Sequence, residues 1–220
     1  MRDIFKAHRN GFWTVGRRRS LYVGFLLIGL SLVIQIAAGH YSSVQSTFAA
    51  PQSDLFLDNI PIVPLGFLIV GMAILFWVLS WSLLVAHPRQ LLFGMKAIAL
   101  FIITRAIFIN LTREGVYPNS FVPTAQNLGF GVYSKLTFQG NLFFSGHTGF
   151  PFLMALIFWS SPFWRRFFLF FTFVFGAAVL LAHVHYSIDV FAAPFIIYGV
   201  YVVTAKLFPE DYALSESAKT

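Results

Sequence analysis

The feature that most constrains this chain is a series of long apolar runs that cover most of its length. Six of them approach the ~20 residues that an α-helix needs to cross the hydrocarbon core of a bilayer. They lie at about 21–39, 61–86, 92–111, 144–161, 166–184 and 188–207. Backbone polar groups in lipid must be satisfied within the segment itself, so such runs form helices. We therefore predict an all-α integral membrane protein with six transmembrane helices in one domain that covers residues 1–220.

The composition agrees with a membrane protein and excludes several functions. The chain is 58% hydrophobic and only 10% charged, whereas a soluble domain carries roughly 25% charged residues. It has no cysteine, which excludes disulfides, iron–sulfur clusters and thiol catalysis. The formal net charge of +7 is compatible with nucleic-acid binding. In a membrane chain we interpret it as a sign of topology instead, and we expect no nucleic-acid partner.

Basic residues are distributed unequally between the two ends of the predicted spans. Twelve of the 15 Lys and Arg residues lie in the two tails and in the connections from the second to the third and from the fourth to the fifth span. This count assigns Lys96 to the connection between the second and third spans. Only Arg113 and Lys135 lie on the opposite side. The positive-inside rule then predicts cytoplasmic N and C termini. The short tails suggest a bacterial inner membrane, with the loops at about 40–60 and 112–143 facing the periplasm.

A few polar residues interrupt the apolar runs, and they gather at one depth. Arg105 lies within the third run, about 9 Å from its outer end at ~1.5 Å per residue. His147 opens the fourth run, and His185 and Asp189 lie where the fifth run meets the sixth. An arginine at this depth can extend to the interface, and a lone histidine is usually structural. Four such groups on one side of the membrane instead predict a functional site at the extracytoplasmic surface.

The residue types in this cluster suit the binding of a phosphate. Ser145 and Gly146 come directly before a predicted helix, and the N-terminus of a helix offers free N–H groups and a positive dipole end to an anion. Gly146 allows a close approach of the backbone. The guanidinium of Arg105 can bind two phosphate oxygens at once.

The same cluster also holds groups that could transfer a phosphoryl group. A carboxylate such as Asp189 can hold one nitrogen of the His185 imidazole and raise the basicity of the other. An imidazole oriented in this way can be a nucleophile toward phosphorus. His147 can then protonate the leaving oxygen as a general acid. Because the site would open among lipid headgroups, we expect a lipid substrate.

At these positions the chain resembles the type 2 phosphatidic-acid phosphatase superfamily, and within it the sphingomyelin-synthase branch. The sequence FSGHT at 144–148 is similar to the Ser-Gly-His-Thr motif of that branch, and HYSIDV at 185–190 is similar to its His-Tyr-Thr/Ser-x-Asp-Val motif. Arg105 followed by Thr112 resembles its third-span motif. The resemblance covers roughly residues 100–205.

The resemblance implies a six-span fold and a role for each residue of the cluster. His185 would be the nucleophile that forms a phosphohistidine, Asp189 would orient it, and His147 would be the acid and later the base. The phosphate ligands would be Arg105, Ser145 and Gly146. Neither a metal nor a cofactor is implied.

Three departures from the superfamily pattern bear on the reaction. The ordinary phosphatases carry Arg-Pro where this chain has Thr112-Arg113, and an arginine where it has Val179. Fewer fixed cations favour a phosphodiester, with one negative charge, over a phosphomonoester, with nearly two. This favours headgroup transfer over dephosphorylation, although Arg113 could still supply a cation. The synthases have Gly-Asp where this chain has Gly140-Asn141, which leaves choline specificity open.

We therefore expect a membrane lipid phosphotransferase that moves a phospho-headgroup from a phospholipid to a lipid alcohol, with membrane lipids as donor and acceptor. The first alternative is a lipid phosphate phosphatase or phospholipid hydrolase that uses water. A second alternative, a transporter, would bind an anion or lipid without chemistry. A third is a metal site formed by His147, His183, His185 and Asp189, which would leave Arg105 unexplained.

Other residues near the motifs have weaker assignments. Possible further contributors to the site are Thr112, Arg113, Asn141 and Tyr186. His183 would face away from His185 on a continuous helix. Asp54 and Asp58 are interpreted as solvated charges of the outer loop.

Overall fold

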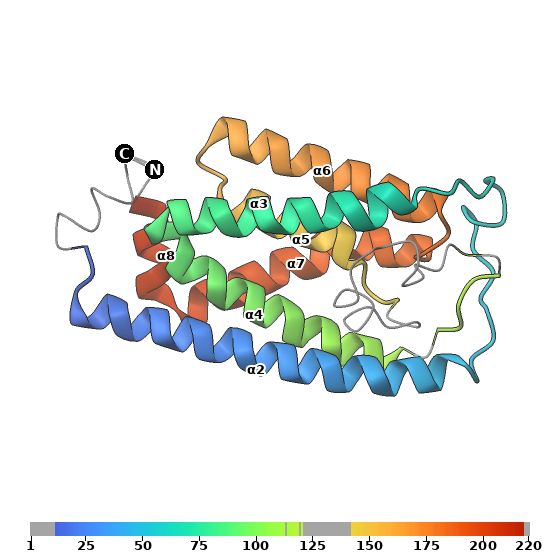
Figure 1. Cartoon of the computed structure of the whole chain (residues 1–220), viewed down its shortest axis with the longest axis horizontal. Coiled ribbons are helices and arrows are strands. Elements are labelled where there is room, and N and C mark those ends of the chain that lie inside the picture. The colour runs from blue at the N-terminus through green and yellow to red at the C-terminus, as the bar shows by residue number, and fades with distance from the viewer. Residues whose placement is uncertain (1–11, 113, 119, 121–141, 218–220) are drawn as a thin grey trace.

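The structure is a computed structural model of the chain, and it describes residues 12–112, 114–118, 120 and 142–217. In this part of the chain every regular element is a helix. The elements are α2 (Val15–Ser46), the π-helix η1 (Phe67–Met72) continued by α3 (Ala73–Ala86), α4 (Pro88–Leu111), α5 (Gly146–Ile157), α6 (Pro162–Leu181), α7 (Ser187–Leu207) and α8 (Pro209–Glu216). They form an elongated bundle with α5 in its interior (Figure 1).

Five helices of the described chain are long and apolar enough to cross a membrane. They are α2, the continuous helix η1–α3, α4, α6 and α7, and they correspond to five of the six predicted spans. The predicted fourth span contains only α5, which has 12 residues and is about 18 Å long at ~1.5 Å per residue. The hydrocarbon core is ~30 Å thick. The all-helical membrane fold is confirmed, and a sixth crossing stays a prediction.

Several helices begin earlier than the apolar runs indicate, because their first turns contain polar residues. The side chain of Thr14 accepts the N–H of Arg17 and caps α2. Pro88, Pro162 and Pro209 stand in the first turns of α4, α6 and α8, where a missing N–H costs no helical hydrogen bond. α8 was not predicted.

A cluster of aromatic rings holds α5 between α3 and α6. The ring of Phe76 in α3 lies edge-on to Phe150 of α5, and to Phe168 and Phe175 of α6, with centroids 6.1, 5.6 and 5.4 Å away. Trp77 stacks on Phe150 at 3.8 Å. Since Phe150 is one turn after the start of α5, this packing fixes the position of that start within the bundle.

The structure corrects the assignment of Lys96 to a connection. Lys96 lies within α4 and is 2% exposed. Its ammonium is 2.6 Å from a carboxylate oxygen of Asp211 in α8 and donates to the hydroxyl of Ser20 in α2 at 2.6 Å. A buried lysine is tolerated only where it is paired, and its partner comes from a helix that the hydropathy pattern did not reveal. The other eleven residues of the count still favour cytoplasmic termini.

The two ends of the bundle differ in what they contain. Figure 1 shows the start of α2, the α3–α4 connection and α8 at one end. The loops around 47–66, 112–118 and 182–186 lie at the other end, towards which the start of α5 points (Figure 1). The residues that carry the motifs therefore meet at the end opposite to α8.

Candidate active site

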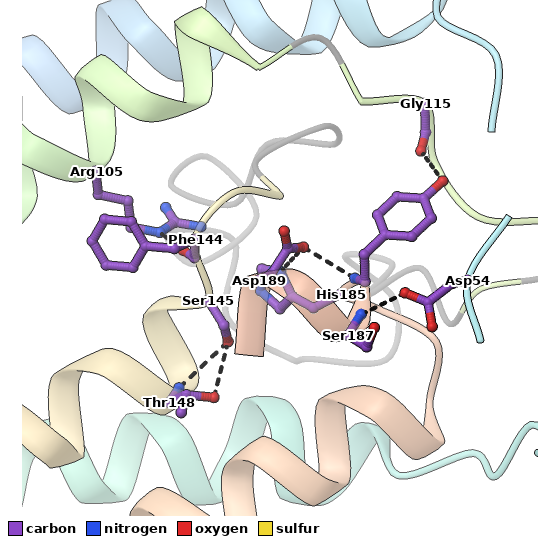
Figure 2. Close-up of polar contacts among 10 residues, drawn as sticks. Asp54, Arg105, Gly115, Phe144, Ser145, Thr148, His185, Ser187 and Asp189 are labelled. Atoms are coloured by element: carbon purple, nitrogen blue, oxygen red, sulfur yellow. Dashed lines mark hydrogen bonds and ion pairs between the residues drawn. The ribbon is translucent and has the colours of Figure 1, made fainter. Parts of the chain in front are cut away.

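His185 and Asp189 form a buried pair where α6 gives way to α7. Nδ1 of His185 lies 3.1 Å from Oδ2 of Asp189, and the same oxygen accepts the N–H of Tyr186 at 3.0 Å (Figure 2). Asp189 is fully buried and His185 nearly so. The carboxylate therefore caps the start of α7 and holds the imidazole at the same time. The geometry leaves Nε2 of His185 as the nitrogen that can act on a substrate.

The chain reverses between α6 and α7 through a short, well-defined turn. The N–H of His183 donates to the carbonyl of Leu180 and the N–H of Val184 to that of Val179, both at 2.9 Å. These two bonds form the Schellman pattern that ends a helix. The sequence interpretation assumed a continuous helix from His183 to His185. The structure instead ends α6 before His183. The turn sets His185 just before α7, within reach of Asp189.

His147 is the second histidine of the site, in the first turn of α5. Its ring centroid is 6.2 Å from that of His185. Its Nε2 lies 2.9 Å from the carbonyl oxygen of Ile69 and donates to it. Ile69 belongs to the π-helix η1, and π-helical turns are frequent at functional sites. With Nε2 held by a carbonyl, Nδ1 of His147 is the nitrogen that can exchange a proton with a substrate.

The start of α5 is fixed to the start of α7 by Ser145. The hydroxyl of Ser145 accepts the N–H of Thr148 at 3.4 Å, as an N-cap does. The N–H of Ser145 donates to the backbone carbonyl of Asp189 at 3.1 Å. The polar atoms of Ser145 are thus engaged in positioning the two helices. The predicted phosphate-binding role of Ser145 and Gly146 stays a prediction, which the first N–H groups of α5 suit because the helical ladder leaves them open.

Arg105 of α4 lies against this helix start. Its Nε donates to the carbonyl of Phe144 at 3.0 Å (Figure 2). A Cβ added to Gly146 would lie 3.2 Å from Nε of Arg105, so the glycine permits this close approach. The guanidinium is thus bound inside the bundle, where its charge adds to the positive end of the α5 dipole. Together they suit an anion such as phosphate.

The charge state of His185 follows from its surroundings. Burial lowers the pKa of His185 well below the ordinary range of histidine, and the positive charge of Arg105 lowers it further. A backbone hydrogen bond with Leu142 raises the pKa but does not outweigh these two effects, so His185 is neutral at physiological pH. This is the form that a nucleophile requires.

Asp54 is a site residue that sequence reasoning misjudged as solvated. It is buried, and its Oδ2 accepts the N–H of Ser187, the first residue of α7, at 2.7 Å (Figure 2). Its Oδ1 accepts the N–H groups of Phe56 and Leu57. Burial by itself would raise the pKa of Asp54, but these N–H groups outweigh it and the pKa lies below its ordinary value. The local turn is typical of aspartate, whereas the contact with α7 has no local sequence signal.

The hydroxyls of Tyr186 and Thr112 are hydrogen-bonded to backbone groups. The hydroxyl of Tyr186 donates to the carbonyl of Gly115 at 2.8 Å and accepts the N–H of Gln52 at 3.0 Å. Tyr186 therefore ties two loops to the turn that carries His185. The hydroxyl of Thr112 donates to the carbonyl of Phe108 in its own helix at 2.9 Å. Arg113 and Asn141, the other two possible contributors, lie outside the described residues.

A cavity of about 520 Å³ adjoins the site on the loop side. Residues that line it include Asp54, Thr112, Glu114, Tyr186 and Ser187. Burial and the negative charge of Asp189 raise the pKa of Glu114 to about 7. Glu114 was not among the predicted site residues, because one glutamate in a loop carries no signal. Within the described residues, no three His, Cys, Asp or Glu side chains are grouped as metal ligands.

Comparison with known proteins gives one finding. Residues 140–206 match a family model described as PAP2 superfamily C-terminal. The matched segment contains Ser145, Gly146, His147, His185 and Asp189, and it does not include Arg105. No curated protein and no solved structure matches the chain. The match supports the PAP2 superfamily, whose members are phosphatases and phosphotransferases, and with it an enzyme that acts by phosphoryl transfer or hydrolysis.

Proposed function

We propose that the protein is a membrane lipid phosphotransferase of the sphingomyelin-synthase type, which moves a phospho-headgroup from a phospholipid to a lipid alcohol. The observation that carries this proposal is the pairing of the two histidines. His185 is held by Asp189 at 3.1 Å, and the ring of His147 stands 6.2 Å from it with its own nitrogen fixed by Ile69. A nucleophile and an acid, each oriented by a separate partner, are what a two-step transfer needs.

The first step forms a phosphohistidine. Nε2 of His185 attacks the phosphorus of the donor, and the bond from phosphorus to the diacylglycerol oxygen breaks. His147, in its protonated form, gives its proton to that oxygen, and diacylglycerol leaves. Arg105 and the N-terminus of α5 would stabilise the negative charge on the phosphoryl oxygens.

The second step returns the enzyme to its starting state. His147, now neutral, takes the proton from the hydroxyl of the acceptor lipid. The hydroxyl oxygen attacks the phosphorus, and the bond from phosphorus to Nε2 of His185 breaks. The product is the acceptor lipid with the phospho-headgroup. With water as acceptor, the same steps release a phospho-headgroup.

The surroundings of the site favour a diester substrate over a monoester. Val179 stands where the resemblance places an arginine in the lipid phosphatases, and it is fully buried among the apolar residues Ala178, Ala182 and Val190. No second cation can therefore come from this position. A site with fewer fixed cations suits the single charge of a phosphodiester better than the two charges of a phosphomonoester.

The test is a transfer assay with purified protein in detergent micelles or vesicles. The donor is a phospholipid labelled in its headgroup phosphate, with diacylglycerol and ceramide present as acceptors. We expect label on a new lipid, and we expect His185→Asn to abolish its formation. His40→Asn, which replaces an exposed histidine of α2, is the matched control and should leave transfer unchanged. Label that appears only in water-soluble products would instead identify a hydrolase.

A further inference from the structure

His183 is a buried histidine for which the proposed reaction has no role. It is 3% exposed. Within the described residues, neither of its ring nitrogens has a hydrogen-bond partner. A buried polar group without a partner is destabilising. Burial of the His183 imidazole is therefore unfavourable, and no hydrogen bond within the described residues compensates for it.

The backbone of His183 carries a second cost. Its φ is 54°, in the left-handed region. His183 occupies the position of the Schellman turn after α6 at which glycine is usual, because glycine adopts this conformation without steric strain. A histidine here is disfavoured both by its backbone and by its buried side chain. Strain of this kind gathers at functional sites.

The neighbours of His183 place its ring on the loop side of the site. The ring stands edge-on to Tyr117, with centroids 5.1 Å apart, and the hydroxyl of Tyr117 donates to Asp58 at 2.7 Å. Figure 2 shows Arg105 on one side of His185 and Gly115 on the other. Tyr117 is two residues from Gly115. The ring of Tyr117 also lies edge-on to that of Tyr186, the residue after His185, with centroids 6.0 Å apart. His183 therefore lies near the side of His185 towards which the headgroup of a substrate held by Arg105 would extend.

We propose that His183 is a substrate-binding residue, whose imidazole hydrogen-bonds an oxygen of the phospholipid headgroup on the side away from Arg105. A neutral imidazole offers one N–H donor and one acceptor, so a phosphoester or hydroxyl oxygen of the headgroup satisfies it. Substrate binding would supply the partner that the described residues do not provide. This inference rests on the proposed function, because it needs a phospholipid in the site.

The test separates binding from turnover by using the His185→Asn background. The probes are the dihexanoyl forms of phosphatidylcholine, phosphatidylethanolamine and phosphatidylglycerol, titrated in detergent. We expect at least one to bind, and His183→Gly to weaken it about tenfold, the equivalent of one lost hydrogen bond. The same substitution should raise the Tm of the ligand-free protein by about 2–4 °C, because it relieves the left-handed strain.

The rise in Tm and the loss of affinity together distinguish a binding role from a structural one. A higher Tm with unchanged affinity would show that His183 only ends a helix and would overturn the proposal. Failure of all three lipids to bind the parent would overturn it as well. His183→Asn also tolerates a left-handed backbone and serves if His183→Gly does not fold. An unchanged affinity in His183→Asn would then overturn the proposal. His40→Asn is the control.

The proposed function is tested by a different measurement, the turnover of phospholipid by the His185→Asn variant. Phospholipid turnover that survives His185→Asn would refute the phosphohistidine mechanism. Weakened binding in His183→Gly would still support the role of His183. A failure of the role of His183 can therefore be distinguished from a failure of the phosphohistidine mechanism.

Discussion

At the scale of single residues, the site combines oriented imidazoles with buried carboxylates of different character. Asp189 holds His185 and accepts a backbone N–H, whereas Asp54 accepts three backbone N–H groups. Glu114, like Asp189, has one carboxylate oxygen that is buried and has no hydrogen-bond partner within the described residues. Its environment therefore favours the protonated form.

Glu114 should make the stability of the protein depend on pH. Its pKa is about 7 in the folded protein and 4.5 ordinarily. Between these values Glu114 binds more protons in the folded state than in the unfolded state, so its contribution to the free energy of unfolding falls as the pH rises from 5 to 8. We expect Glu114→Gln to lack this contribution, so the stability of the parent relative to the variant should fall from pH 5 to pH 8, which thermal unfolding at pH 5, 6, 7 and 8 measures. Glu210→Gln, on the exposed face of α8, is the control. An identical pH profile in Glu114→Gln would contradict the prediction.

At the scale of elements, the site depends on two helix starts held against each other. Ser145 caps α5 and donates to Asp189 of α7, while Asp54 caps α7 from a distant loop. The motifs could be recognised from sequence because each lies within one short stretch of chain. The contact from Asp54 joins residues 133 positions apart. No local pattern could have indicated it.

Loss of the Asp54 carboxylate should affect both stability and catalysis. Asp54→Ala leaves the buried N–H of Ser187 without its acceptor, which destabilises the fold by about 1–3 kcal/mol. The start of α7 carries Asp189, so kcat should fall as well. Asp54→Asn keeps an acceptor oxygen and should lose less of both. The measurements are denaturant unfolding and the transfer assay. Full activity in a folded Asp54→Ala protein would show that the cap does not position the site.

At the scale of the whole molecule, the bundle is closed at one end by α8 and carries the site at the other. Lys96, Asp211 and Ser20 join α4, α8 and α2 at the closed end. The pair is buried, and a buried ion pair is weak support for stability. It does determine where α8 packs, because an unpaired Lys96 would be strongly destabilising at this depth.

The orientation of the bundle in the membrane can be tested because the chain has no cysteine. Ser53→Cys, Ser160→Cys and Ser217→Cys each introduce one exposed thiol. With cytoplasmic termini, only the thiol at 53 should react with a membrane-impermeant maleimide in intact spheroplasts. The thiols at 160 and 217 should react after permeabilisation. Labelling of position 217 in intact spheroplasts would reverse the predicted topology.

The sequence alone determined the helical membrane fold and the chemical character of the site, because hydropathy and short motifs are properties of contiguous residues. It predicted five of the helices to within a few residues at most ends, and it placed His147, His185 and Asp189 together. Only the tertiary structure decided how these groups are held. It revealed the roles of Asp54, Glu114 and Lys96, the short α5 and the left-handed turn at His183. Burial and pairing depend on which distant segments meet, and that is fixed by packing in three dimensions.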